Sequence, residues 1–315
     1  MSAMRDTMAT QPSLLRELLA DGGPTEAAAG RIRGRRVLLV GTGTSWHAAN
    51  QGAWLLRAAG AEAWPIQAVD AADHGPRPGA GDALVLLSHR GTKRYTNTVL
   101  ERARADGAET VVISGRGAPG ADIETSDPET SAAFTASHLG ALMRVAQIAV
   151  ALGADLGRLE QVPDIVEAVL DAPDPGVDSP GRLLEFVGAG PNQWTAAEGA
   201  LKVRETCYVA TQGLSVEQLL HGPSVALREG DTLVALNGNG PGEGRLLEIA
   251  RLAEACGARV HTIAATYPSE LLSIFPLTTA VQRIALDLAE SLGTNPDSFG
   301  RDLPGRAEAL GAIEL

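Results

Sequence analysis

The sequence predicts an α/β protein built from two tandem domains, each with a mostly parallel sheet between helices in three layers. From residue 35 onward, short apolar runs alternate with alanine-rich helical segments, a pattern typical of βαβ units and a parallel sheet. The chain then repeats itself, because residues 183–202 resemble residues 37–56, with a Gly-x-Gly at the same place in both. Internal similarity of this kind indicates two copies of one fold.

The expected elements follow in chain order. Residues 11–20 have leucines at helical spacing and precede Asp-Gly-Gly-Pro, so they predict a short amphipathic helix and a break. The first copy is expected to have strands at 37–40, 83–87 and 110–113 and helices at 45–59, 94–106, 131–152 and 156–170. The second copy is expected to end with a helix near 280–292 and an irregular tail.

Composition also predicts the domain boundaries. We expect an N-terminal helix and linker at 1–34, a first domain at 35–171, a linker at 172–181 and a second domain at 182–315. The linker is rich in Pro, Gly and Asp, the residues that interrupt regular structure.

Composition argues against several classes of function. The chain has 315 residues, 44% of them hydrophobic, which is enough for two packed domains. A net charge of −12 argues against nucleic acid as a partner, since no basic block is present to replace counterions. Only Cys207 and Cys256 occur, and the histidines have no ligand spacing, so no disulfide framework or metal site is predicted. No signal pattern or long apolar run stands out, and we expect a soluble, cytoplasmic protein with no membrane partner.

Two loops of the first copy are candidates for binding an anion. Gly41-Thr42-Gly43-Thr44-Ser45 follows a strand and opens a helix, where backbone N–H groups and the helix dipole attract negative charge. A nucleotide fingerprint would need a further glycine where Trp46 stands, so a nucleotide cofactor is not expected. The second loop, Ser88-His89-Arg90-Gly91-Thr92-Lys93-Arg94, also follows a strand and carries hydroxyls and cations.

The candidate anion-binding residues are Gly43, Thr44, Ser45, Ser88, His89, Arg90, Thr92 and Lys93. For any one of the cations, the alternative is a solvated helix start. The matching place in the second copy, residues 237–242, has no cation and no hydroxyl, so anion binding is predicted for the first copy alone. Glu129 and Thr135 are expected at the start of a long helix near the same sheet edge, where they would contact the rest of the ligand or cap the helix.

The second copy carries the candidates for acid–base chemistry. Glu198, Lys202 and Glu205 fall at i, i+4 and i+7 and would share one face of a helix. His221 stands just before Gly222-Pro223, which ends any helix and holds the imidazole in a stiff turn. A carboxylate and an imidazole at fixed positions suit proton transfer. The alternative is a surface ion pair and a loop histidine.

Lysine is scarce in this chain. Among 26 basic residues only Lys93 and Lys202 are lysines, and each lies in a stretch already singled out. Arginine has taken the other cationic positions, which favours a functional reading of both lysines.

These motifs together resemble the SIS (sugar isomerase) domain family, in particular the two-SIS-domain isomerase half of glucosamine-6-phosphate synthase and the related amino-sugar phosphate isomerases, deaminases and deglycases. The resemblance covers roughly residues 35–300 and is carried by GTGTSWHAA, the Ser88 loop, the stretch at Glu129, EGALKVRE, LLHGP and GTNPD. It implies two flavodoxin-like SIS domains and no cofactor. It also implies phosphate binding at Ser45 and Ser88.

The resemblance assigns roles to the acid–base candidates. Glu205 matches the general base that moves a proton between C1 and C2 of the open-chain sugar, and Lys202 matches the active-site lysine. His221 matches the ring-opening histidine, which the neighbouring subunit donates in synthase-like enzymes. A homodimer with a shared active site is therefore expected.

Three departures from the family pattern limit what is carried over. The usual phosphate loop Ser-x-Ser-Gly-x-Thr has Arg90 and Lys93 in place of its second serine and its threonine. No lysine lies near the C-terminus, where the synthase has one, and the sequence contains no glutamine-hydrolysing domain. A stand-alone isomerase, deaminase or deglycase is therefore favoured.

The sequence therefore predicts an enzyme that opens a phosphorylated ketose or amino sugar and transfers a proton between C1 and C2, with or without loss of an amine. Two alternatives stay open. One is a non-catalytic regulatory SIS protein that binds a sugar phosphate. The other is an isomerase or aminotransferase subunit without its own glutaminase domain.

Overall fold

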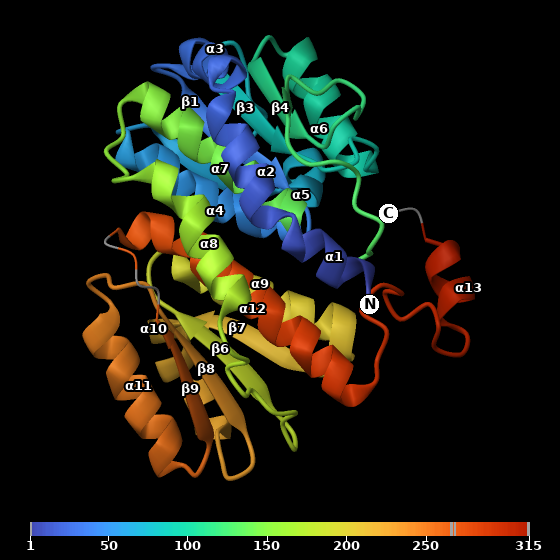
Figure 1. Ribbon diagram of the computed structural model, residues 1–315. Coiled ribbons are helices and arrows are strands. Elements are labelled where there is room, and N and C mark those ends of the chain that lie inside the picture. The colour runs from blue at the N-terminus through green and yellow to red at the C-terminus, as the bar shows by residue number, and fades with distance from the viewer. Residues whose placement is uncertain (1, 265–266, 268, 314–315) are drawn as a thin grey trace. The chain divides into compact units, whose positions relative to one another are not determined.

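Two parallel sheets form the framework of the chain (Figure 1). The computed structural model describes residues 2–264, 267 and 269–313. The first sheet has the order β2-β1-β3-β4-β5, with β1 (Arg36–Gly41), β2 (Ala63–Gln67), β3 (Asp82–Leu87), β4 (Glu109–Ser114) and β5 (Ile123–Glu124). The second has the order β7-β6-β8-β9, with β6 (Leu184–Gly188), β7 (Thr211–Ser215), β8 (Thr232–Asn237) and β9 (Arg259–Ala264). The predicted α/β class is confirmed.

The chain divides into two compact units, each built on one sheet. The first-sheet unit comprises Thr10–Glu129, Ala136–Pro163 and the last described residue, Ile313. The second-sheet unit comprises Met1–Ala9, Thr130–Thr135 and Asp164–Ala312. Both units are discontinuous in sequence, whereas the boundaries expected from the sequence follow chain order.

In the first-sheet unit, helices cover both faces of the sheet. One face carries α5 (Ala68–Asp73) and α6 (Arg94–Ala105), whose apolar residues form a core with alternate residues of β1 and β3. The other carries α4 (Thr44–Ala58) and α7 (Ala136–Leu152), with α2 (Gln11–Ala20) and α3 (Gly23–Ile32) packed on α7. The short 3-10 helix η1 (Leu159–Gln161) completes the unit.

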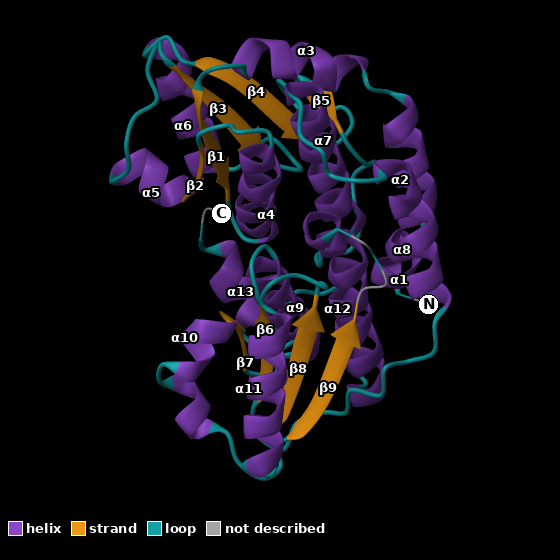
Figure 2. Cartoon of the chain, turned by 90° about the vertical axis from the view of Figure 1, so that its left-hand side faces the viewer, coloured by secondary structure: helices purple, strands orange, loops and turns teal. Residues whose placement is uncertain are grey.

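The second-sheet unit has the same three layers (Figure 2). One face is covered by α9 (Asn192–Cys207) and α12 (Glu270–Leu292), and the other by α10 (Val216–Leu220) and α11 (Glu243–Ala255). The 3-10 helix η2 (Pro223–Ala226) follows α10. The unit also contains α1 (Ala3–Ala9), α13 (Arg306–Gly311) and most of α8 (Val162–Asp171). Met4 and Met8 of α1 are buried against Leu286 of α12.

The N-terminal segment is more helical than its sequence predicts. Residues 1–34 contain α1, α2 and α3, where one helix and a linker were expected. Pro24, read as a helix breaker, lies in the first turn of α3, a position that needs no N–H donor. The end of α2 is held by Arg144, whose buried guanidinium donates to the Leu18 carbonyl at 3.2 Å and the Asp21 carbonyl at 2.6 Å.

Two predicted helices have the wrong start. The helix expected at 131–152 begins at Ala136, because Glu129 caps it: the Glu129 Oε1 accepts a hydrogen bond from the Ser137 N–H at 2.7 Å. The helix expected near 280–292 begins at Glu270 and contains Pro276, and the tail expected to be irregular contains α13.

Helix α12 has the length and composition of a membrane span. It is the one helix with these properties among the described residues. Its most apolar 18-residue stretch has a mean hydropathy of 1.3, and 78% of that stretch is buried inside the protein. That burial is typical of a core helix, since a helix that is apolar on all sides needs partners all round.

Candidate functional site

The two loops expected to bind an anion lie where the strand order of the first sheet reverses. β1 lies between β2 and β3, so the chain leaves β1 toward one side and β3 toward the other. In open α/β sheets, ligands bind at such a point, outside the carboxyl ends of the strands. β1 and β3 pair in parallel, with Val40 opposite Leu86, so the loops at Gly43–Ser45 and Ser88–Lys93 leave the same edge.

Glycines set the geometry of the first loop. A Cβ on Gly41 would lie 2.3 Å from the Ser45 carbonyl oxygen, so the end of β1 approaches α4 too closely for any side chain. Gly43 has a φ of +58°, a conformation that favours glycine. The Ser45 N–H donates to the Thr42 carbonyl at 3.1 Å and the Trp46 N–H to the Gly43 carbonyl at 2.9 Å. These two amides therefore close the turn, whereas the sequence predicted free amides for an anion.

The Ser88 loop is a tight turn with its cations at the rim. Ser88 is buried, and its carbonyl accepts from the Gly91 N–H at 3.1 Å. Arg90 and Thr92 are exposed, and Lys93 is half-buried at the residue preceding α6. The next residue in the chain, Arg94, lies over the Tyr95 ring at 5.4 Å.

His89 and Glu129 connect this turn to the start of α7. The Glu129 N–H donates to His89 Nε2 at 3.3 Å, and the Glu129 carboxylate caps α7. Burial lowers the pKa of His89, Glu129 raises it and Arg90 lowers it further, so the net shift is downward. A neutral imidazole that accepts a hydrogen bond fits this site. Thr135 is buried in the second-sheet unit, where its carbonyl accepts from Gln282 of α12 at 3.3 Å.

The acid–base candidates on α9 form a buried cluster. The Lys202 Nζ lies 2.7 Å from Glu205 Oε2 and 3.4 Å from Glu198 Oε1. The side chains of Lys202 and Glu198 have no exposed surface, and that of Glu205 is 15% exposed. The alternative of a surface ion pair is therefore wrong. Glu205 is the member of the cluster that reaches solvent.

Two glycines allow α9 to be enclosed in this way. A Cβ on Gly199 would lie 2.9 Å from Val281 Cβ of α12, so the two helices pack unusually closely. On the other side, a Cβ on Gly213 of β7 would lie 2.2 Å from the Ala196 carbonyl oxygen. In the Glu-Gly-Ala-Leu-Lys sequence, the glycine thus lets α12 pack close to α9, and the glutamate and lysine beside it are buried.

His221 lies apart from this cluster within one chain. It follows the last residue of α10, and its side chain is 76% exposed. Its Nε2 lies 3.2 Å from Glu217 Oε2, and Glu217 also pairs with Arg245 at 2.6 Å. Gly222 has a φ of 141°, so the predicted glycine turn is present. The structure does not bring the imidazole into hydrogen-bonding contact with Glu205 of the same chain.

Sequence reasoning missed an acidic group inside the second sheet. Glu185, the second residue of β6, is 2% exposed and lies near the fully buried Asp231, and both carboxyl groups have an oxygen without a hydrogen-bond partner. Burial and the neighbouring Asp231 raise the pKa of Glu185 to about 7, and Arg182 lowers it in part. The signal in the sequence was a glutamate inside an apolar strand, Leu-Leu-Glu-Phe-Val.

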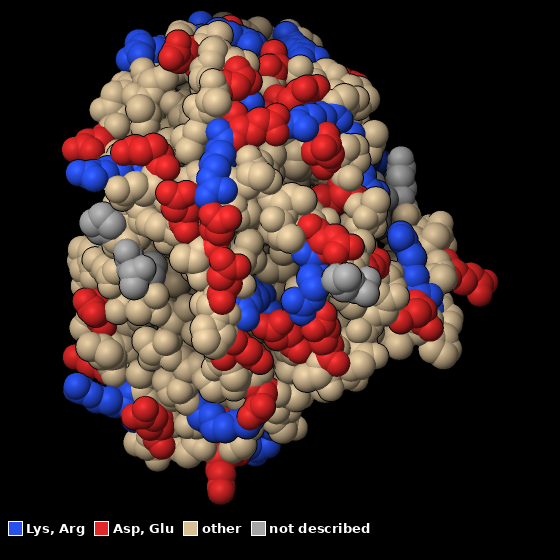
Figure 3. Space-filling view, in the orientation of Figure 1, with Lys and Arg blue, Asp and Glu red and all other residues tan. Residues whose placement is uncertain are grey.

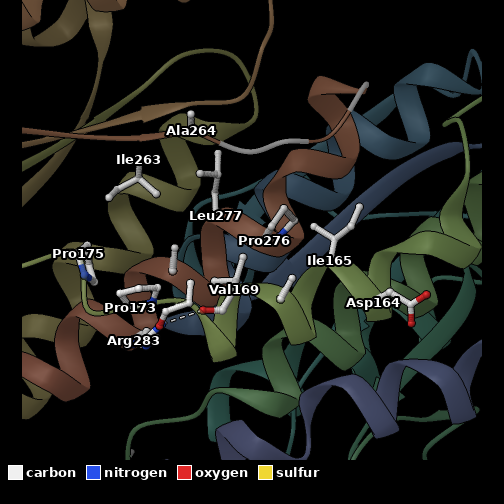
Figure 4. Close-up of a pocket in the computed structure, with 13 residues that line it drawn as sticks. Asp164, Ile165, Val169, Pro173, Pro175, Ile263, Ala264, Pro276, Leu277 and Arg283 are labelled. Atoms are coloured by element: carbon white, nitrogen blue, oxygen red, sulfur yellow. Dashed lines mark hydrogen bonds between the residues drawn. The ribbon is translucent and has the colours of Figure 1, made fainter.

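The second-sheet unit also contains an apolar cavity of about 430 Å³ (Figure 4). It lies among α8, α12, the end of β9 and the segment after α8. Its Arg283 guanidinium donates to the Val169 carbonyl at 2.9 Å and so closes the end of α8. This lining does not suit a phosphorylated sugar, which needs several polar partners.

The surface charge is mixed on the face drawn in Figure 3. Acidic and basic side chains alternate there, and the described residues of that face form no continuous basic surface.

Comparison with known proteins agrees with the fold and the motifs. Residues 32–151 match the family model of the SIS domain, which confirms the resemblance seen in the sequence over this part of the chain. Over 301 residues the chain is 27% identical to glutamine–fructose-6-phosphate aminotransferase (isomerizing) of Pyrococcus horikoshii, covering 83% of this chain and 50% of the relative. The chain spans about half the length of the curated relatives it matches.

Solved structures resemble this chain in fold over nearly its full length. The C-terminal domain of glucosamine-fructose-6-phosphate aminotransferase from Francisella tularensis has a TM-score of 0.81 at 16% identity, covering 94% of this chain and 98% of that one. Tagatose-6-phosphate ketose/aldose isomerase from Escherichia coli has a TM-score of 0.80 at 18% identity, with 95% of both chains covered. At these identities the likeness is one of fold.

Proposed function

We propose that this chain is a sugar-phosphate isomerase-type enzyme that opens a phosphorylated ketose or amino sugar and transfers a proton between C1 and C2, with or without release of an amine. The observation that carries the proposal is the Glu198–Lys202–Glu205 cluster on α9. Burying three charges is costly and stabilises a fold poorly compared with apolar packing. A cluster of this kind at a helix surface that reaches solvent through one carboxylate is therefore better explained by chemistry.

In this proposal Glu205 is the general base. Its carboxylate removes a proton from one of the two carbons of the open-chain sugar, and the C–H electron pair forms the C1–C2 double bond of an enediol as the carbonyl oxygen takes up charge. The same carboxyl group then returns the proton to the neighbouring carbon, while the proton of the adjacent hydroxyl passes to the former carbonyl oxygen, so that the hydroxyl oxygen becomes the new carbonyl. Lys202 holds the carboxylate in one orientation at 2.7 Å, and Glu198 holds the ammonium from the other side.

The phosphate is proposed to bind at the carboxyl edge of the first sheet. Ser45 and Ser88 would donate hydroxyl hydrogen bonds at the start of α4 and the end of β3. Arg90 and Lys93 would supply the charge that the usual hydroxyl-rich loop lacks. Gly43, Thr44, His89, Thr92 and Glu129 complete the proposed set.

His221 is proposed to act on the ring oxygen of a sugar bound by a second copy of the chain. Its 76% exposed imidazole is available to a partner, and Glu217, which pairs with it, lies on α10 just before it in the chain. An imidazole suits this step because it gains and loses protons near neutral pH. A homodimer with an active site shared between subunits follows from this assignment.

The domain assignment belongs to the same proposal. We assign tandem flavodoxin-like SIS domains to residues 35–171 and 182–315, joined by the linker at 172–181, and place the enzyme in the cytoplasm.

Two alternatives have observations in their favour. A non-catalytic sugar-phosphate sensor is favoured by the separation of His221 from Glu205 within one chain. Amine transfer, with ammonia from another source, is favoured by the names of the relatives, which are aminotransferases.

The test is a phosphorus-31 NMR time course with fructose 6-phosphate, glucose 6-phosphate, glucosamine 6-phosphate and an amine-linked fructose 6-phosphate. Glu205→Gln and Glu198→Gln form a matched pair, since both carboxylates contact the Lys202 ammonium and only Glu205 reaches solvent. We expect a new phosphate resonance with the wild type, none with Glu205→Gln, and a slower one with Glu198→Gln.

The outcomes separate the candidate functions. The productive substrate distinguishes isomerase from deaminase and deglycase. A resonance that appears when ammonia is added to fructose 6-phosphate points to amine transfer. Broadening of substrate resonances without turnover supports the sensor, and equal turnover by wild type and Glu205→Gln rules out Glu205 as the base.

A further inference from the structure

The segment that carries His221 is held partly by local hydrogen bonds: the His221 N–H donates to the Glu217 carbonyl at 3.0 Å, and the Leu227 N–H to the Ser224 carbonyl at 3.1 Å. Residues 221–226 include η2, and the residues of η2 are not buried. Within the segment, the Val225 N–H donates to the Gly222 carbonyl at 3.1 Å, and the glycine at 222 adopts a φ of 141°. A short exposed helix after a flexible glycine is not rigid by itself. Contacts from outside the segment must add to these local bonds to fix its position.

A charged group at the opposite end of the sheet strands supplies that fixation. Arg182, just before β6, donates to the Ala226 carbonyl at 2.6 Å and pairs with Asp231, just before β8. The Asp231 Oδ2 also accepts from the Arg228 N–H at 3.0 Å. Both ends of the stretch from Ala226 to Arg228 are thus bound to the Arg182–Asp231 pair.

Glu185 completes this group from within the sheet. It lies on β6, three residues after Arg182, on the face that packs against α10 and α11. Leu219 and Leu227 join the apolar core of this face on either side of the His221 turn. The charged groups that act on Glu185 are Asp231 and Arg182. From α10 and α11 this core receives the apolar residues Val216, Leu219, Leu246, Ile249 and Ala253.

We propose that Arg182, Asp231 and Glu185 are positioning residues for His221, holding the segment 221–228 in place and releasing it in part when Glu185 ionises. This inference rests on the proposed function for the role of His221. The anchoring itself is a property of the unliganded chain. When Glu185 carries a proton, the Arg182 guanidinium pairs with the Asp231 carboxylate and donates to the Ala226 carbonyl, with no second carboxylate to attract it. When Glu185 loses that proton, two buried carboxylates compete for one guanidinium, which weakens its hold on Ala226.

The pKa of Glu185, raised to about 7, places this ionisation near neutral pH. Glu185 Oε2 and Asp231 Oδ1 are both buried without a hydrogen-bond partner, so no donor stabilises a negative charge on the Glu185 carboxyl at that oxygen.

The experiment is hydrogen–deuterium exchange of the whole chain without sugar phosphate, so its result does not depend on whether the chain is an isomerase. The variant is Arg182→Gln, tolerable because the Arg182 side chain is 41% exposed. Its matched control is Arg259→Gln, which removes an arginine on β9 that contacts Asp178, Ser179 and Thr232 and leaves residues 221–228 untouched. In Arg182→Gln we expect exchange at 221–228 to be about tenfold faster, because the variant loses one charged hydrogen bond. Exchange in α9 and α12 should be unchanged.

Glu185→Gln tests the proton. In the wild type, exchange at 221–228, corrected for its intrinsic pH dependence, should rise between pH 6 and 8 on the order of tenfold. In Glu185→Gln the rise should be absent. Equal exchange in Arg182→Gln and Arg259→Gln, or an increase spread evenly over the second-sheet unit, overturns the proposal.

Turnover then separates positioning from simple stability. If a substrate is found, Arg182→Gln should lower kcat for ring-closed sugar phosphates and leave unchanged the rate for a sugar phosphate too short to cyclise. A uniform loss for both kinds of substrate would show that the group acts through stability alone.

Discussion

Glu185→Gln should remove a pH dependence from the stability of the protein. Burial and Asp231 raise the pKa of the folded-state carboxyl from 4.5 to about 7. Between these values the folded chain holds a proton that the unfolded chain has released, so the free energy of unfolding falls as the pH rises through this window. Below pH 4.5 the favourable contribution is complete, and above pH 7 it is lost.

The magnitude follows from the shift in pKa. A shift of about 2.5 pH units corresponds to about 3 kcal/mol at 1.36 kcal/mol per unit. Most of this, about 2.5 kcal/mol, is lost between pH 5 and 8. The glutamine variant cannot ionise, so it lacks this slope even if its buried amide lowers stability by a constant amount.

The assay is urea unfolding followed by circular dichroism at pH 5, 6, 7 and 8 for the wild type, Glu185→Gln and the control Glu229→Gln, whose carboxyl is exposed. Subtracting the wild-type profile from each variant cancels the other titrating groups. From pH 5 to pH 8 we expect the free energy of unfolding of Glu185→Gln to rise by about 2.5 kcal/mol relative to that of the wild type. The profile of Glu229→Gln should run parallel to that of the wild type. A parallel profile for Glu185→Gln would refute the argument.

Three further predictions test the packing and the site. Lys202→Met should abolish turnover and lower stability by about 3 kcal/mol, measured by urea unfolding, because it leaves buried carboxylates without their cation. Gly213→Ala should lower the melting temperature, because the added Cβ would lie 2.2 Å from a carbonyl oxygen. The control Gly244→Ala in α11 has open space around it and should raise stability by ~0.5 kcal/mol. Equal effects of the two substitutions would contradict this reading. Mixing inactive Glu205→Gln and His221→Asn chains should restore about a quarter of wild-type turnover if the site is shared within a dimer, and none if each chain acts alone.

The repeat made most of the fold predictable. Apolar runs and Gly-x-Gly turns occur in both halves, and Gly188 makes the same approach to a helix carbonyl, at 2.2 Å, that Gly41 makes at 2.3 Å. Helix starts were less predictable, because they depend on distant partners. α7 begins where the Glu129 side chain accepts from its first turn, and the first turn of α3 contains a proline that reads as a break in sequence.

The candidate site was predictable in its spacing but not in its environment. Spacing placed Glu198, Lys202 and Glu205 on one face, yet the same spacing is found on solvated helices. Their burial depends on Gly199, which admits α12, and this packing is a tertiary contact that spacing does not encode. Similarly, no pattern near His221 predicts that Arg182 binds the segment that follows it.

The burial of Lys202 has a practical consequence for chemical labelling. The sequence contains two lysines, and the Lys202 ammonium has no exposed surface, while Lys93 is half-buried at the start of α6. An amine-reactive reagent should therefore modify the Lys93 side chain in preference to Lys202 while the protein is folded. Because Lys93 lies in the loop proposed to bind phosphate, its labelling rate in the presence of a phosphate ester reports occupancy of that loop without any need for turnover.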